Sequence, residues 1–317
     1  MDNLILVATQ VGVLFLLMAV GIACRRMRYL DDRVVKGLVE ILVVVVTPCL
    51  VVNAFQRPFS PDMLKGLGFV AFAAVAGHVA AILLVYALLH HRDAARRNVL
   101  RVAAVFSNAG FMGIPLDQAL LGDLGVFYGV IYIGIFNVFI WSWGYGTISG
   151  GGEKGAVSRT EKLRRIAVNP GTIGLALGLP LFFTSTTLPA VLHDSCRFIA
   201  DLNTPLAMFV IGYYLAGAKF GAIVKVKEAY FSAAFRLVGY PLMMIGFLLL
   251  ARNFMALDRT MMLALVVSAS APVAALTSMI AARCGSDVDL SVGLVSGTTL
   301  LSIVTMPPVI ALAMEIL

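Results

Sequence analysis

The amino-acid sequence predicts an all-α protein that crosses a membrane many times. Of its 317 residues, 60% are hydrophobic and only 13% are charged, and the mean hydropathy is +0.95. A soluble domain of this length is far less apolar. Apolar runs of about 20 residues, the length at which a helix spans a bilayer, recur along the chain. No polar connector between these runs is long enough to form a soluble domain.

Ten such runs are found, and each is expected to be one membrane-spanning helix. In chain order they are Leu4–Cys24, Val35–Phe55, Leu67–His90, Asn98–Leu121, Gly125–Ile148, Asn169–Thr184, Phe198–Phe220, Tyr230–Ala251, Thr260–Ala282 and Leu290–Ile316. The first is expected to stay in the protein as a span. It lacks the preceding basic region and the following small-residue cleavage site that mark a signal peptide.

The connectors predict the orientation of these spans, since Lys and Arg collect on the cytoplasmic side of a membrane. Of the 24 basic residues, 18 fall in the connectors after odd-numbered spans and five in those after even-numbered spans. The remaining one, Arg236, lies inside span 8. The odd-numbered connectors are therefore expected in the cytoplasm and both termini outside.

Charge and cysteine content argue against two other classes of function. The net charge of +7 does not indicate nucleic-acid binding, because the basic residues are spread over short connectors and do not gather on one folded face. The four cysteines form neither a CxxC pair nor a metal-ligand spacing. Neither a metal site nor a disulfide framework is therefore expected.

Residues that match at a spacing of 157 predict that spans 1–5 and 6–10 are repeats. Pro48 in span 2 matches Pro205 in span 7, and Pro115 in span 4 matches Pro272 in span 9. Because each half contains five spans, the second half is expected to be inverted in the membrane relative to the first.

Spans 4 and 9 are predicted to be broken near the middle of the membrane. Span 4 contains "VFSNAGFMGIPLDQALLG", in which proline and glycine disfavour a continuous helix. It is expected to be helical to about Ser107, to unwind over residues 108–113 and to restart near Pro115. Span 9 is expected to be helical to about Ala269 and to restart near Pro272. Unpaired backbone groups are costly in hydrocarbon, so such breaks persist only inside protein or beside a water-filled cavity.

Inverted repeats allow the two restarting helices to point their N-termini at one crossing. Free amides and the positive ends of the helix dipoles then form a site for an anion such as a carboxylate. The residues expected to bind the substrate there are Ser107, Asn108, Ala109, Gly110, Gly113, Pro115, Ser268, Ser270, Ala271 and Pro272. The alternative is a pair of proline kinks that pack against neighbouring helices and bind nothing.

Two basic side chains lie within spans, where ionisable residues are functional candidates. Arg236 is expected to bind the substrate carboxylate or to stabilise a closed state; the alternative is a side chain that reaches the inner interface of the membrane. His78 in span 3 lies one position from the residue that matches Arg236 in the repeat. It is the candidate for coupling transport to protons, and the alternative is a neutral histidine bonded to a backbone carbonyl.

Five other polar residues complete the expectations. Asn137 in span 5 would support the crossing from behind or serve only in structural hydrogen bonding. Thr47 and Thr204 would line the far side of the substrate or only bend their helices. Asp117 and Asp123 are expected to be solvated at the outer mouth, which leaves spans 4, 5 and 9 without a carboxylate at mid-membrane.

Three segments of the chain resemble the auxin efflux carrier family. They are "FSNAGFMGIPLDQALLG", "NTPLAMFVIGYYLAG" and "SGTTLLSIVTMPPV", and the resemblance covers Leu4–Ile316. The family includes plant auxin carriers and bacterial permeases assigned to malonate or malate. The plant carriers have an Asn-Pro pair at the crossing, whereas Asn108 is followed by Ala109 here, and their long cytoplasmic loop is absent. Both departures favour a bacterial small-anion permease of the inner membrane.

The resemblance also implies an architecture and a mechanism. The repeats would cover residues 1–156 and 157–317. Spans 1, 2, 6 and 7 would form a scaffold, and spans 3–5 and 8–10 would form a transport domain. The implied mechanism is an elevator-type movement of the transport domain, with a homodimer formed through the scaffold.

The expected function is therefore secondary active transport of small organic anions, such as malonate or malate. No cofactor is expected, and the coupling ion would be H⁺ or Na⁺. One alternative is a crossed-helix cation/proton antiporter, which would need acidic ligands at the crossing. Another is a membrane sensor without flux. A membrane enzyme is not expected, because the sequence offers neither a paired Asp dyad nor an HExxH motif.

Overall fold

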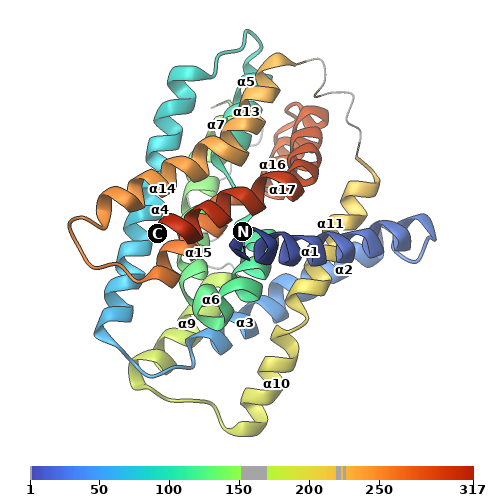
Figure 1. Ribbon diagram of the computed structural model, residues 1–317. Helices are drawn as coiled ribbons and strands as arrows, with labels where there is room; N and C mark the ends of the chain where they lie inside the picture. The colour runs from blue at the N-terminus through green and yellow to red at the C-terminus, as the bar shows by residue number, and fades with distance from the viewer. Residues whose placement is uncertain (1, 151–169, 219–222, 224–225) are drawn as a thin grey trace.

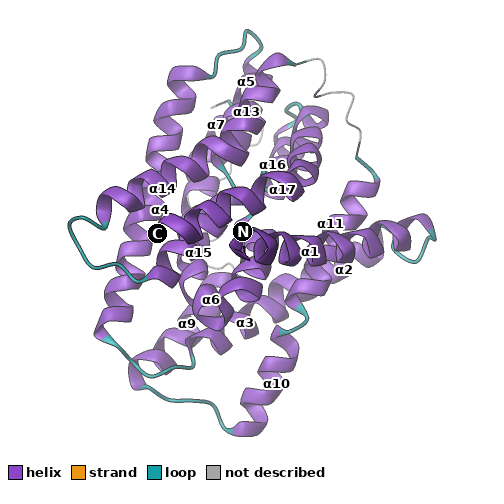
Figure 2. Cartoon of the chain, viewed as in Figure 1, coloured by secondary structure: helices purple, strands orange, loops and turns teal. Residues whose placement is uncertain are grey.

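The computed structural model describes residues 2–150, 170–218, 223 and 226–317. In this part of the chain every regular element is helical, as the sequence predicts, and the one β feature is an isolated bridge (Figure 2). Seven helical segments there are long and apolar enough to cross a membrane. The polar connector after span 5 and two of the basic residues after span 7 (Lys219 and Lys225) lie outside the described residues.

The first three expected spans are helical, except for Leu89 and His90 at the end of the third. They correspond to α1 (Asp2–Arg26), to α2 (Asp32–Ile41) continued by the π-helical turn η1 (Leu42–Val46) and α3 (Thr47–Phe55), and to α4 (Pro61–Leu88). Local chemistry explains the starts of two of these helices. Asp31 accepts a hydrogen bond from the amide of Val34 before α2, and Ser60 precedes the proline that opens α4.

Expected spans 4 and 5 form a helix, a break and a hairpin. The elements are α5 (Ala94–Val105), the π-helical turn η2 (Ala109–Gly113), α6 (Ile114–Phe139), the π-helical turn η3 (Ile140–Gly144) and α7 (Tyr145–Ile148). The chain reverses within α6 at Gly122, whose φ of 64° is strained for any residue with a side chain. The two arms of α6 thus belong to different expected spans.

The second half of the chain repeats this pattern of long, interrupted helices. Its described elements are α9 (Pro170–Thr184), α10 (Ala190–Ala200), α11 (Asn203–Ala216), α13 (Lys227–Ala234), η4 (Phe235–Gly239, π-helical), α14 (Tyr240–Ala251), α15 (Arg259–Ser270), α16 (Ala275–Cys284) and α17 (Val288–Ile316).

Small residues allow close packing between the halves of the chain. Helix α1 lies against α11, and α3 lies against α9 (Figure 1). At Gly21 of α1, a Cβ atom would stand 2.5 Å from the carbonyl oxygen of Phe209 in α11. At Gly178 of α9, a Cβ atom would stand 2.8 Å from the Cβ of Phe55 in α3. Each contact therefore pairs a helix of one half with a helix of the other.

The outward faces of the long helices carry large apolar side chains. Leu16 of α1 is 70% exposed, Leu83 of α4 is 65% exposed and Val304 of α17 is 70% exposed. Exposed apolar surface of this extent suits contact with lipid.

Candidate functional site at the crossing of two broken helices

The two broken segments meet and exchange backbone hydrogen bonds. The amide of Asn108 donates to the carbonyl of Pro272 at 2.7 Å, and the amide of Ala274 donates to the carbonyl of Phe106 at 2.9 Å. Ser107 lies between these bonds, in the isolated antiparallel bridge. The sequence-based prediction that both spans are broken and that the breaks meet is therefore confirmed, and their junction is made of main-chain groups.

The position of the first break differs from the prediction. Helix α5 ends at Val105 and the chain resumes a helical path at Ala109, so only three residues are unwound. Pro115 is the second residue of α6 and not the restart. The π-helical turn before it bonds the amide of Ile114 to the carbonyl of Ala109, and this wider turn accommodates a following residue that has no amide hydrogen.

The second break agrees more closely with the prediction. Helix α15 ends at Ser270 and α16 begins at Ala275, with Pro272 inside the unwound segment. Pro115 and Pro272 therefore occupy different places in their spans, although they match in the sequence spacing. The amide of Val273 donates to the hydroxyl of Thr298 in α17 at 3.1 Å. Sequence reasoning missed Thr298, because nothing in a helical threonine indicates which amide its hydroxyl will bind.

The start of η2 has the features of an anion site. The amides of Ala109, Gly110 and Phe111 have no acceptor among the residues that the structure describes. The side chain of Asn108 makes no hydrogen bond to them either, and it is 6% exposed. A Cβ atom at Gly110 would meet nothing within 4 Å, so the backbone there is open to a ligand. Such free amides at a helix N-terminus attract negative charge.

Arg236 lies on the opposite side of the crossing, at the C-terminal ends of the first half-helices. Its guanidinium donates to the carbonyl of Val105 at 2.7 Å and also to the carbonyl of Ala269. The guanidinium carbon is 4.2 Å from the ring centre of Tyr240. The side chain is fully buried, so it does not extend to the membrane interface. It places a positive charge where both helix dipoles are negative.

A chain of hydroxyl groups connects the crossing to this arginine. The hydroxyl of Ser107 is 3.4 Å from that of Tyr132, which is 3.2 Å from that of Tyr240. All three residues are buried. Sequence reasoning missed both tyrosines, since an aromatic residue in an apolar helix gives no sign of a polar role.

His78 is buried beside this chain. Its Nδ1 is 2.7 Å from the carbonyl of Ala74, and its Nε2 has no hydrogen-bond partner in the described residues. Its ring stacks on Phe139 at 5.2 Å and lies 5.4 Å from the ring of Tyr132. The bond to Ala74 is the one expected of a neutral, structural histidine.

Of the other predicted site residues, some bond within their own helices and others lie close to a break. Ser270 donates to Val266, Asn137 donates to Ile133 and Thr47 donates to Leu42, each within its own helical segment. Thr204 is in the first turn of α11, the helix that faces η2. The remaining members, Ala109, Gly113, Ser268 and Ala271, are at or within two turns of a break.

The position of Asp117 contradicts the sequence-based expectation. It is fully buried and not solvated at an outer mouth. Among the described residues neither carboxyl oxygen forms a hydrogen bond, and the buried hydroxyl of Ser268, which lies near it in α15, is likewise without a partner. The expectation failed because the hairpin at Gly122 folds the second arm of α6 over this carboxyl. Asp123 is accessible, as expected, and accepts from Gln118 at 3.0 Å.

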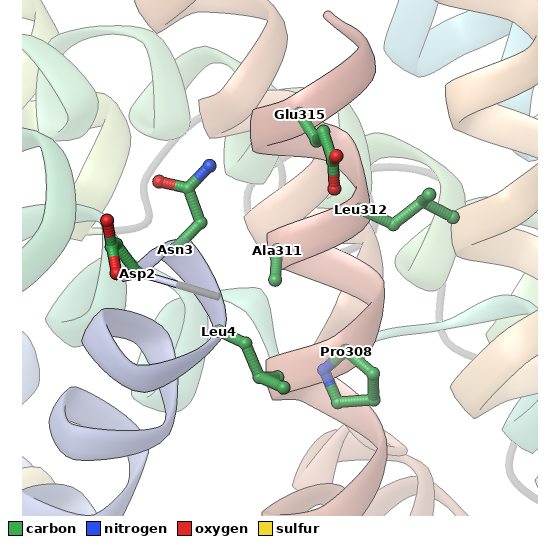
Figure 3. Close-up of a pocket in the computed structure, with 7 residues that line it drawn as sticks. All are labelled: Asp2, Asn3, Leu4, Pro308, Ala311, Leu312 and Glu315. Atoms are coloured by element: carbon green, nitrogen blue, oxygen red, sulfur yellow. The ribbon is translucent and has the colours of Figure 1, made fainter.

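Two surface cavities lie apart from the crossing. One, of about 520 Å³, is between the start of α1 and the end of α17; Figure 3 shows Asp2 and Glu315 at its rim. The other, of about 750 Å³, is between the start of α4 and the segment before α15. Neither is lined by a residue of the two breaks.

All four cysteines are free thiols.

The chain was compared with curated proteins and with protein families. Among curated proteins, none matches the chain at a significant level. The family of membrane transport proteins, in contrast, matches residues 6–310 and so almost the whole chain. The crossed, broken helices, the apolar surface and this match lead to one conclusion: the chain belongs to the membrane transport protein family, the family of the auxin efflux carriers.

Proposed function

We propose that this membrane transporter is a secondary active carrier of small organic anions, such as malonate or malate, in the bacterial inner membrane. The observation that carries the proposal is the set of free amides at residues 109–111 beside the unpaired side chain of Asn108. A carboxylate can accept from several of these donors at once. The adjacent helix dipole adds a favourable interaction without a fixed cation.

The proposed topology has ten spans in two inverted repeats, with both termini outside. Its support is the exchange of partners between the halves of the chain. Helix α1 (span 1) packs on α11 (span 7), and α9 (span 6) packs on α3 (span 2). Inverted repeats would produce such reciprocal pairs.

The proposed mechanism is an elevator-type movement, driven by an H⁺ or Na⁺ gradient. Spans 1, 2, 6 and 7 would form a static scaffold that dimerises, and the other six would carry the crossing across the membrane. The support is that α11 faces η2, so a scaffold helix stands opposite the free amides. Sliding of one group past the other would move the anion between the two sides.

A crossed-helix cation/proton antiporter is the second candidate, and Asp117 is the observation that favours it. The sequence left this function as an alternative because no carboxylate was expected at mid-membrane in spans 4, 5 and 9, whereas the carboxyl of Asp117 is buried inside the protein. One buried carboxyl with one hydroxyl neighbour is nevertheless a sparse set of ligands for a metal cation.

Uptake into proteoliposomes separates these functions. Purified protein would be tested with radiolabelled malonate, malate, succinate and acetate, under separate proton and sodium gradients. We expect saturable uptake of at least one dicarboxylate. Cation or proton flux that needs no organic anion would instead support the antiporter, and the absence of flux with every substrate and ion would contradict both.

A further inference from the structure

The buried carboxyl of Asp117 is a titratable group that the anion site does not use. It lies eight residues after the start of η2, which is about 12 Å along the helix axis. It packs against Gly129 in the returning arm of α6 and lies near Ser268 of α15. The carboxyl therefore lies where both broken spans and span 5 come together.

The environment of this carboxyl disfavours a negative charge. The side chain has no solvent exposure, and neither oxygen has a hydrogen-bond partner within the described residues. An ionised carboxylate without compensation is far more costly to bury than a neutral carboxylic acid. The acid form is thus the one that suits this conformation.

No charge among the described residues compensates the carboxyl. Neither carboxyl oxygen has a hydrogen-bond or ion-pair partner there. Helix α9 and η2 have no ionisable side chain, and α3 has only the thiol of Cys49. Other ionisable groups are present on α6, on α1, α4 and α15 packed against it, and on the adjoining loops, but none forms a hydrogen bond with the carboxyl: Asp2, Cys24, Arg25, Arg26, Arg57, Asp62, Lys65, His78, Tyr86, Asp123, Tyr128, Tyr132, Asp258 and Arg259.

Close packing around the carboxyl of Asp117 favours a proton over a metal cation as the ion that it binds. A Cβ atom added to Gly129 would stand 2.5 Å from Oδ2 of Asp117, so the carboxyl already fills the space that the glycine leaves. A metal cation needs several oxygen ligands around it. Among the described residues no oxygen is hydrogen-bonded to the carboxyl, and the hydroxyl of Ser268 is the polar group that lies near it. A proton needs neither the space nor the ligands.

We propose that Asp117 is the proton-binding residue that couples anion transport to the proton gradient, with Ser268 as its hydrogen-bond partner when it ionises. The proposal rests on the proposed anion transport. An anion at residues 109–111 and a carboxylate at Asp117 would repel each other along one helix, so anion binding favours the protonated carboxyl. Linkage is reciprocal, and protonation of Asp117 therefore favours anion binding. Anion and proton would be carried together and released together.

The test uses purified protein in proteoliposomes, with Asp117→Asn as the variant and Asp123→Asn as the control on the same hairpin. Two modes are compared in sodium-free buffer: exchange of internal for external malonate, and net malonate uptake driven by an inward proton gradient. We expect Asp117→Asn, which imitates the protonated acid, to keep exchange but to lose acceleration by the proton gradient. Asp123→Asn should keep both. Continued acceleration in Asp117→Asn would overturn the proposal.

Two further measurements keep the proposal testable if malonate is not carried or if Asp117→Asn does not fold. Infrared spectroscopy of the purified wild type should show the C=O band of a protonated carboxylic acid, and that band should be absent from Asp117→Asn but present in Asp123→Asn. Ser268→Ala removes the donor that would stabilise the ionised form, so the pH midpoint of proton-driven uptake should rise. An unchanged band or an unchanged midpoint contradicts the role of Asp117.

The last measurement is uptake driven by a sodium gradient. A sodium gradient that drives uptake by the wild type but not by Asp117→Asn would assign the carboxyl to Na⁺ and overturn the proton. Failure of the wild type to exchange any anion would contradict the proposed function, while the infrared measurement would still decide whether Asp117 holds a proton.

Discussion

Arg236 and Asn108 act on opposite sides of the same crossing, and their surroundings give them different roles. The guanidinium of Arg236 donates from its two terminal nitrogens to the carbonyls of Val105 and Ala269 and lies over the ring of Tyr240, and only its Nε has no partner among the described residues. The amide group of Asn108 has no partner in the described chain and lies beside three free backbone amides. Asn108 is therefore available to a substrate, whereas Arg236 stabilises the ends of the helices.

Replacement of Asn108 by alanine should abolish anion uptake and leave the fold intact. The substitution removes a side-chain donor from the proposed site but no hydrogen bond within the described protein. Uptake in proteoliposomes and size-exclusion chromatography in detergent would measure the two effects. Asn253→Ala, at an exposed position, is the control. Normal transport by Asn108→Ala would show that the anion binds elsewhere.

Replacement of Arg236 by methionine should destabilise the protein as a whole. Two buried carbonyls would lose their donor, at a cost of about 3 kcal/mol. The expected result is a lower midpoint of thermal unfolding in detergent, with Arg33→Met at an exposed position unchanged. Arg236→Lys should be intermediate, since its ammonium lacks the planar fork that reaches both helices. A methionine variant as stable as the wild type would remove Arg236 from this structural role.

For individual residues, the sequence predicted some surroundings and missed others, and each outcome has a physical reason. The place of Asn108 in a break could be predicted, because the glycines and proline that follow it in an apolar span disfavour a continuous helix. The burial of Asp117 could not, because it depends on a hairpin that brings Gly129 against the carboxyl. The partners of Arg236 could not either, since they are main-chain carbonyls 33 and 131 residues away.

Among the helices, close approach at glycine fixes the relation between α1 and α11. Gly21 and Gly212 stand on facing surfaces, and a Cβ atom at Gly212 would collide with the carbonyl oxygen of Met18. In a membrane, where apolar burial does not drive helices together, such backbone proximity is a main source of packing energy.

Gly212→Ala should separate these two helices and lower thermal stability, by about 1–3 kcal/mol as for other overpacked sites. The matched control is Gly246→Ala in α14, where a Cβ atom would meet nothing within 4 Å. Thermal unfolding of both variants in detergent measures the difference. Equal midpoints would mean that α1 and α11 adjust without cost.

For whole helices, sequence patterns predicted the breaks better than the residue at which a helix restarts. Hydropathy and proline content predicted which helices are broken, and both breaks are present. The exact restart of span 4 was six residues too late in the prediction, at Pro115 and not at Ala109. A proline tolerates several places in the first turns of a helix, and a π-helical turn before it is not visible in residue type alone.

Across the whole molecule, an aromatic cluster joins the two groups of helices that the proposed movement would separate. The ring of Phe127 in α6 is 4.6 Å from that of Phe55 in α3 and 5.3 Å from that of Phe182 in α9. If α6 slides past α3 and α9, these contacts must break and re-form in each cycle.

A disulfide across this interface should therefore arrest transport. Cysteines would replace Phe55 and Phe127 in a background without the four native cysteines, and the pair would be oxidised. Uptake should stop on oxidation and return on reduction. The control pair replaces Phe69 of α4 and Phe247 of α14, whose rings lie 6.3 Å apart within the proposed moving group. Undiminished uptake by the cross-linked Phe55–Phe127 pair would contradict the movement of one group past the other.

The bonds that hold the crossing together run between peptide groups, from Asn108 to Pro272 and from Ala274 to Phe106. Every residue except proline carries the same backbone N–H and C=O groups, so other substitutions of the neighbouring side chains keep the donors and acceptors of the junction. Evolution can therefore change what this architecture carries by altering a few side chains, without having to invent the fold again.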